Sequence, residues 1–352
     1  MAHLALWALS LVLRMGTDRG AAFMTATLVT LAAAVIVAFQ IPRAGAPSTR
    51  LVNEGSPART IGERLLFHGD GRFYARLARD PLMEHPEWNV SVEETAYRWQ
   101  RPVAVYAAWL LALGDPTRVT GALVAVSLLG MGFAAFWFAL LAQRHGRSHR
   151  WGLTVLLIPG LLSGLSWLSP ESLGVGLALA GVFTGNVVWL VLAGLCRESL
   201  LVVPVVLLIR SRAPRYLWPL VVFGSWAVLV RVRVGAWFYD AAPGGFGAIF
   251  RMGADRVQEP DAHLLILGIT AACLVFAIKR GGLYGWLVIG YAGLTLFLGE
   301  PVLGRWQDYT RPLAPLYAFA VLAVLQDCVE RNVSSNTPEP RARAGLQAAT
   351  RE

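Results

Sequence analysis

The sequence predicts an all-α protein that crosses a membrane many times, and three observations support this fold class. Hydrophobic residues make up 56% of the chain, charged residues make up only 15%, and the mean hydropathy is +0.53. Apolar runs recur from Ala21 to Leu325, and the clearest are about 20 residues long, the length that a helix needs to cross a hydrocarbon core. Charged residues lie mostly between these runs. We therefore expect one transmembrane domain over residues 1–327, with about ten crossings, and a disordered cytoplasmic tail over residues 328–352.

The distribution of charge and the spacing of the cysteines indicate which partners the chain binds. The formal net charge is +9, from 31 basic and 22 acidic residues. The basic residues fall mainly in loops, so membrane topology and contact with lipid phosphates explain them better than binding to nucleic acid. Three cysteines lie far apart and predict neither a disulfide framework nor a metal site. The expected partner is thus the lipid bilayer, and the Ala, Gly and Arg bias indicates a bacterial cytoplasmic membrane.

The first span is expected over Ala21–Ile41. Met1–Leu13 is apolar but too short to cross, and we interpret it as an interfacial segment. Arg14 and Arg19 precede the first span and place the N-terminus inside, because cytoplasmic loops carry the excess of basic residues. The loop over residues 42–117 then lies outside.

The next span is expected over Thr120–Ala142, and it ends at the basic cluster Arg144–Arg150, which we place inside. A second basic group starts at Arg210, so the chain between must cross an even number of times. We expect four short spans there: Trp151–Leu168, Pro170–Thr184, Asn186–Cys196 and Ser199–Ile209. The last two are too short to cross alone and are expected to be half-helices buried in the bundle.

The remaining chain is expected to cross four more times. The predicted spans are Tyr216–Val230, His263–Ile278, Leu283–Leu298 and Pro312–Leu325. A second outer loop, rich in glycine and aromatic residues, lies over 235–261. This topology places both termini inside.

The longest polar stretch runs over residues 67–101 and contains the main candidate for catalysis, Asp70. Gly69 and Gly71 flank Asp70 and allow the backbone to approach a ligand closely, so that its carboxylate is available to accept a proton. The alternative is a turn in which Asp70 caps the helix that begins near Phe73. Asp80 is interpreted as the end of that helix, because a proline follows it.

Several arginines in the chain suit a phosphate ligand, because a guanidinium donates two parallel hydrogen bonds. A helix over residues 93–101 would place Tyr97 and Arg101 on one face, and Arg101 has no acid one turn before it. Glu94 and Arg98 have the spacing of an ion pair. Arg101 is therefore a candidate to hold an anionic head group, with interfacial anchoring as the alternative.

Charges within apolar stretches add further candidates. Arg197 and Glu198 interrupt an apolar stretch, where charges usually face a cavity or one another. They either bind substrate or mark the point at which two half-helices meet. Arg311 precedes the last span and is a candidate to bind a phosphate, with headgroup anchoring as the alternative. Glu171 is interpreted as a first-turn acid favoured by its helix dipole.

Five short motifs, read in order, resemble those of a known family. They are Asp70-Gly71-x-x-Tyr74, Tyr97-Arg98-Trp99-Gln100-Arg101-Pro102, Pro170-Glu171, Cys196-Arg197-Glu198-Ser199 and Tyr309-Thr310-Arg311-Pro312. Together they resemble a bacterial member of the GT-C superfamily of polytopic membrane glycosyltransferases, over roughly residues 20–327. Many members of this family take sugars from polyprenyl phosphates.

The resemblance implies a function and a site. Asp70 would be the base in an inverting hexosyl or pentosyl transfer, at the outer face, from a polyprenyl-phosphate-linked sugar to an acceptor. Tyr74, Arg101, Arg197, Glu198 and Arg311 would bind substrate. Many relatives have paired acids early in the first loop where this chain has one, so a divalent metal stays open and no cofactor is assigned. A transporter, and a non-catalytic protein that retained the fold, are the alternatives.

Overall fold

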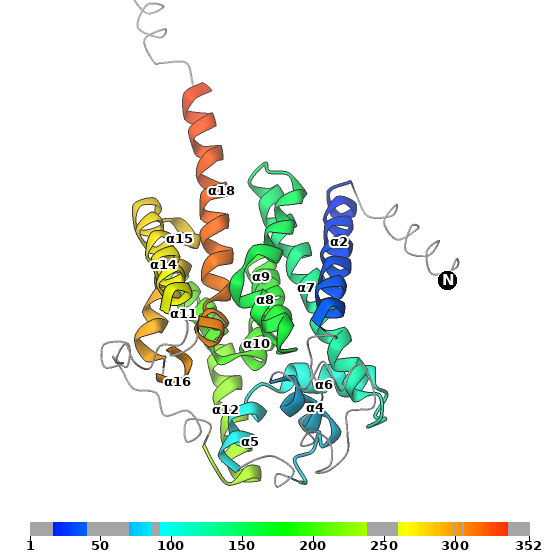
Figure 1. Cartoon of the computed structure of the whole chain (residues 1–352). Coiled ribbons are helices and arrows are strands. Elements are labelled where there is room, and N and C mark those ends of the chain that lie inside the picture. Colours follow the sequence, from blue (N-terminus) through cyan, green and yellow to red (C-terminus); the bar gives the residue numbers. More distant parts are fainter. Residues whose placement is uncertain are drawn as a thin grey trace, which may run out of the picture.

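The computed structural model describes residues 17–40, 70–85, 92–237, 260–298, 300–303 and 306–336. Within these ranges all regular structure is helical and no residue lies in a strand, which confirms the all-α prediction for this part of the chain (Figure 1). The segment Met1–Leu13, residues 42–69 of the first loop and most of the second loop lie outside the described residues.

Among the described residues, three helices are long and apolar enough to cross a membrane, judged by length and composition. They are α2 (Thr17–Gln40), α7 (Val119–Arg144) and α12 (Trp218–Val234), the last extended at its start by a 3-10 turn over Pro214–Leu217. Several shorter apolar helices accompany them. This composition suits a protein of the lipid bilayer.

The predicted span Trp151–Leu168 is not one continuous helix, because this segment is broken into two pieces. Residues His149–Leu157 form a 3-10 helix, and α8 covers Pro159–Ser166. Ile158 between them is extended, with φ −78° and ψ 112°, because the ring of the following proline disfavours the helical conformation in the preceding residue. The next three segments agree with the prediction to within a few residues: α9 (Glu171–Thr184), α10 (Val187–Cys196) and α11 (Val202–Ser211).

Small residues let α7 pack closely against its neighbours. A Cβ atom added to Gly130 of α7 would lie 2.7 Å from the backbone nitrogen of Leu173 in α9. A Cβ added to Gly176 of α9 would lie 2.9 Å from the nitrogen of Ala134 in α7. Such close approach replaces the hydrophobic effect as the source of helix association in lipid. Helices α2, α7 and α9 therefore form one closely packed wall.

The C-terminal helices form a second group. Helices α14 (Pro260–Arg280), α15 (Gly282–Leu294) and α18 (Ala314–Asn336) contact one another, and α18 also contacts α7, α8 and α9. Helix α18 continues to Asn336, beyond Leu325 where the last span was predicted to end. Residues 337–352 lie outside the described part of the chain.

Three short helices gather at one end of the bundle, which we call the α4–α6 end. They are α4 (Gly71–Arg79), α5 (Val92–Trp99) and α6 (Pro102–Leu111), drawn at the bottom of Figure 1 near α12 and α16 (Glu300–Leu303). Helix α6 has 10 residues and is too short to cross a membrane. The single helix expected over 93–101 is broken before Arg101, whose φ of −114° and ψ of 59° precede Pro102.

Candidate active site

Asp70 lies at the start of α4, but its carboxylate does not cap that helix. The residue has helical torsion angles, φ −62° and ψ −22°, and its side chain accepts no capping hydrogen bond. The carboxylate binds two guanidinium groups instead, with Oδ2 2.6 Å from Nη1 of Arg311 and Oδ1 3.4 Å from Nη2 of Arg98. The side chain is 18% exposed. The capping alternative is therefore wrong, and the carboxylate faces a cluster of cations.

Arg311 is the centre of this cluster. It follows α17 (Trp306–Thr310) and precedes α18, and its Nη2 donates to Oδ1 of Asp308 at 2.7 Å. Its guanidinium lies 4.5 Å from the centre of the Trp167 ring, and its Nη1 is 3.9 Å from a carboxylate oxygen of Glu171. Only 7% of the side chain is exposed. Arg311 thus joins three acids that come from separate segments of the chain.

The second cation on Asp70, Arg98, comes from the end of α5. Its guanidinium stacks on the ring of Phe73, 3.7 Å from the ring centre. Phe73 lies in the first turn of α4. Helix α5 is itself held by Trp226 of α12, whose Nε1 donates to the carbonyl oxygen of Trp99 at 2.7 Å. The predicted Glu94–Arg98 pair is not tested, because the Glu94 side chain lies outside the described part of the structure.

Arg101 is buried and already bound to an acid. Its Nε and Nη2 donate to the two carboxylate oxygens of Glu198 at 2.9 and 2.7 Å. The same guanidinium donates to the hydroxyls of Tyr74, at 3.1 Å, and Tyr97, at 2.8 Å. Four of its five N–H donors are therefore engaged within the protein, and the binding of a head group by Arg101 stays a prediction. The residue ties α4 and α6 to the break between α10 and α11.

The remaining pair, Arg197 with Glu171, is almost fully enclosed. Nη1 of Arg197 is in ion-pair contact with Oε1 of Glu171, and the two side chains are 6% and 1% exposed. Gly164 of α8 lies against the acid, since a Cβ there would be 3.3 Å from Oε2 of Glu171. Glu171 does lie in the first turn of α9, as predicted, and it also neutralises a buried cation.

Positive and negative charges balance in the described part of the cluster. Its arginines are Arg98, Arg101, Arg197 and Arg311, and its acids are Asp70, Glu171, Glu198 and Asp308. Each acid faces a guanidinium, and within the described residues no three acidic, histidine or cysteine side chains form a group that could hold a metal ion. Because these acids are paired with arginines, they do not present a ready site for a divalent metal. No step of the proposed reaction depends on one.

The two arginines determine the protonation of Asp70. Burial raises the pKa of this carboxyl, but the opposite charges of Arg311 and Arg98 and the hydrogen bond from Arg311 outweigh it and hold the pKa well below its usual value. Asp70 is therefore an ionised carboxylate near neutral pH. That is the form that can accept a proton.

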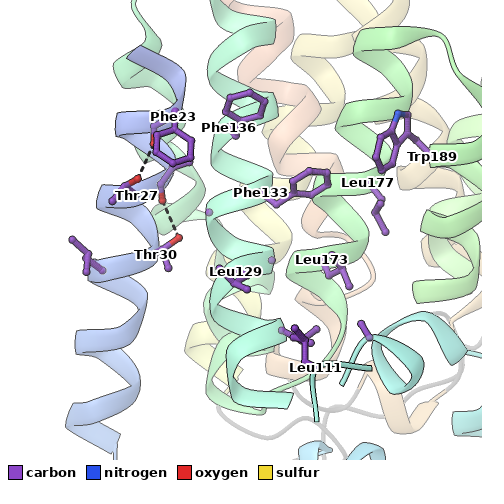
Figure 2. A pocket seen from close by; sticks show the side chains of 16 residues that line it. Phe23, Thr27, Thr30, Leu111, Leu129, Phe133, Phe136, Leu173, Leu177 and Trp189 are labelled. Carbon is purple, nitrogen blue, oxygen red and sulfur yellow. Dashed lines mark hydrogen bonds between the residues drawn. The ribbon is translucent and has the colours of Figure 1, made fainter. Parts of the chain in front are cut away.

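A large apolar groove lies in the bundle, away from the charges. Its volume is about 770 Å³, and it is lined by residues of α2, α6, α7, α9 and α10, among them Phe23, Leu111, Phe133 and Trp189 (Figure 2). Thr27 and Thr30 also line it, but their hydroxyls donate to backbone carbonyls of α2. Leu173 and Leu177 line the groove from α9, whereas Glu171, two residues before Leu173, lies on the opposite face of that helix. Helix α9 therefore stands between the groove and the buried Glu171.

All six predicted site residues belong to the charged cluster at the α4–α6 end: Asp70, Tyr74, Arg101, Arg197, Glu198 and Arg311. Sequence reasoning missed the rings of Phe73 and Trp167. Asp308 lies three residues before Arg311, and this short separation in the sequence was the signal for their contact. No pattern in the sequence links Trp167 to Arg311.

Comparison with family models, with curated proteins and with solved structures found no match to this chain.

Proposed function

We propose that this chain is a membrane glycosyltransferase, which moves a sugar from a polyprenyl-phosphate donor to an acceptor hydroxyl. The observation that carries the proposal is the contact between Asp70 and Arg311, which are 241 residues apart in the chain and meet at 2.6 Å. Folding thereby places an ionised carboxylate beside guanidinium groups in a partly exposed position. A base for the acceptor and a cation for the leaving phosphate are the two groups that this transfer needs.

The chemistry assigns a role to each group. The Asp70 carboxylate removes the proton from the acceptor hydroxyl as the hydroxyl oxygen attacks the anomeric carbon. Arg311 and Arg98 stabilise the charge that develops on the phosphate as it leaves. The attack from the side opposite the phosphate inverts the anomeric carbon. Tyr74, Arg101, Arg197 and Glu198 hold the surrounding helices in place.

The proposal includes a topology. The α4–α6 end lies at the outer face of a bacterial cytoplasmic membrane, both termini lie inside, and the chain crosses about ten times. The short segments α8–α11 provide the broken helices near the site. Polyprenyl-phosphate-linked sugar is the donor, and the charged cluster, not the apolar groove, carries the assignment.

Asp70→Asn in the purified full chain tests the function. Wild type, supplied with a panel of polyprenyl-phosphate sugars and acceptors, should transfer at least one sugar, and the variant should be about 10²- to 10⁴-fold slower because it lacks the base. Asp115→Asn removes an acid from the turn after α6, away from the cluster, and should leave the rate unchanged. Equal rates in wild type and Asp70→Asn would disprove the assigned role.

The same preparation separates the alternatives. Uptake of a solute into liposomes, driven by its gradient, would favour a transporter. Absence of both transfer and uptake would favour a non-catalytic protein with the same fold.

A further inference from the structure

Asp70 lies between two guanidinium groups, as a bound anion would. The carboxylate contacts Arg311 at 2.6 Å and Arg98 at 3.4 Å. The guanidinium carbons of Arg311 and Arg98 lie over the rings of Trp167 and Phe73, 4.5 and 3.7 Å from the ring centres. These cation–π contacts hold the guanidinium groups without using their N–H donors. The arrangement is that of an anion site with the anion supplied by the chain itself.

Arg311 also has donor capacity that Asp70 does not use. Its Nε is buried and has no acceptor among the residues that the structure describes, while its two terminal nitrogens bind Asp70 and Asp308. A buried donor without an acceptor is costly. A phosphate group carries more acceptor oxygens than a carboxylate and can satisfy such a donor as well.

We propose that Asp70 and the phosphate of the substrate compete for Arg311 and Arg98, so that the arriving phosphate frees the carboxylate to act as the base. This inference rests on the proposed function and adds the order of events at the same site. In the resting cluster the carboxylate is stabilised by two cations and is a poor proton acceptor. Once a phosphate takes over part of the contact with the arginines, the carboxylate regains its basicity.

The charges balance through the reaction. Before transfer, the phosphodiester and the Asp70 carboxylate each carry one negative charge. The acceptor oxygen forms a bond to the anomeric carbon, the bond between that carbon and the phosphate oxygen breaks with its electron pair, and the acceptor's proton moves to Asp70. The product phosphomonoester then carries two negative charges and Asp70 none. Arg311 and Arg98 therefore face two negative charges throughout the reaction. One of these charges moves from the carboxylate to the phosphate.

Competition predicts that removing the charge of Asp70 strengthens phosphate binding. The test measures the affinity of the purified full chain for farnesyl monophosphate, a short isoprenoid phosphate, with farnesol as the probe that lacks the phosphate. Asp70→Asn should bind farnesyl monophosphate about tenfold more tightly than wild type, because the arginines no longer have a competing anion. Arg311→Gln should bind it more weakly. Farnesol should bind all three proteins equally.

The matched control is Asp115→Asn, which removes one negative charge at a 37% exposed site paired with Arg118. It should change the affinity by less than about twofold, because an exposed charge acts weakly through water. A similar gain in Asp115→Asn and Asp70→Asn would mean that net charge alone is responsible and would overturn the proposal. Unchanged or weaker binding by Asp70→Asn would overturn it as well.

Loss of folding in Asp70→Asn is also informative. The variant leaves two buried arginines without their shared acid, and phosphate should replace it. Farnesyl monophosphate, but not farnesol, should then raise the melting temperature of the variant more than that of wild type. A variant that stays unfolded with the phosphate present would contradict the proposal. Because binding needs no sugar transfer, tighter binding without any transfer would disprove the glycosyltransferase and leave the anion site intact.

Discussion

Two of the ion-paired groups in the charged cluster contain the same chemical groups in different surroundings. In one of them, Glu171 and Arg197 are 1% and 6% exposed and face each other between α8, α9 and the break after α10. In the other, Asp70 is 18% exposed and contacts Arg311 and Arg98, which are 7% and 10% exposed. We call them the enclosed pair and the open pair. Arg311 contacts acids of both.

This difference in exposure decides which of the two ion pairs can exchange its partner for a ligand. An enclosed ion pair cannot exchange its partner for a ligand, because either charge alone would remain buried in an apolar medium. The open pair can exchange its partner for a ligand, because its carboxylate already borders solvent and aromatic rings hold its arginines. An ion pair between helices is therefore a candidate for chemistry only where one partner remains accessible.

The largest effect is expected in the enclosed pair. Glu171→Gln leaves Arg197 as a buried cation without its acid and should destabilise the protein by about 3–5 kcal/mol. Replacing both residues by methionine should recover most of this loss, since an apolar pair of similar volume needs no counter-ion. Denaturation of the purified protein in detergent gives the comparison.

Breaking the exposed pair Asp115–Arg118 provides the control for this experiment. Both side chains are more than one third exposed, at 37% and 68%, so Asp115→Asn should leave stability nearly unchanged. If Glu171→Gln were as mild as Asp115→Asn, the enclosed pair would have no structural role and the comparison would fail.

A smaller effect is expected from Gly160→Ala, which disturbs the segment that carries Arg311. A Cβ at Gly160 of α8 would overlap the carbonyl oxygen of Thr310 and lie 2.9 Å from the Cβ of Ala314. We expect a loss of about 1–3 kcal/mol in stability, because backbone must move to make room. Binding of farnesyl monophosphate should weaken as Arg311 shifts.

Gly121→Ala in α7 is the matched substitution. Nothing lies within 4 Å of the added Cβ, so the change should be neutral or slightly stabilising in a helix. Equal behaviour of the two alanine variants would show that contact between α8 and the Thr310 carbonyl does not position Arg311.

The smallest effect concerns the pH dependence of the open pair. Its two arginines hold the pKa of Asp70 below the usual value of about 3.9. A depressed pKa means that the carboxylate stabilises the fold above the unfolded-state pKa, and that this contribution is lost as pH falls toward the folded-state pKa. The melting temperature of wild type should therefore decline below about pH 4 more steeply than that of Asp70→Asn. Parallel curves for the two proteins would contradict the described contacts.

Much of the helical framework was predictable because its signals are local. Apolar runs located α2, α7, α9, α10, α14 and α15 to within a few residues. The effect of a proline on the preceding residue is also local, yet the helix breaks at Ile158 and Arg101 were not predicted. In both places an apolar or amphipathic pattern continues across the proline, and the prediction followed that pattern.

The sequence predicted members of the charged cluster but not their pairing. Arg197 and Glu198 were singled out because charges within an apolar stretch are costly, Asp70 because glycines flank it, and Arg311 because it precedes the last span. Which acid meets which arginine depends on where distant helices end. The contact between Arg101 and Glu198 is an example, since the two residues are 97 positions apart in the chain.

By itself, the sequence determined that this chain is a bundle of apolar helices with a polar segment around Asp70, because hydrophobic length and periodicity act over short distances. Only the tertiary structure decided that Arg311 faces Asp70, that Arg101 is taken by Glu198, and that Glu171 is enclosed. Ion pairing depends on distances of a few ångströms between segments far apart in the chain. Those distances are fixed by the packing of helix ends, which no local pattern encodes.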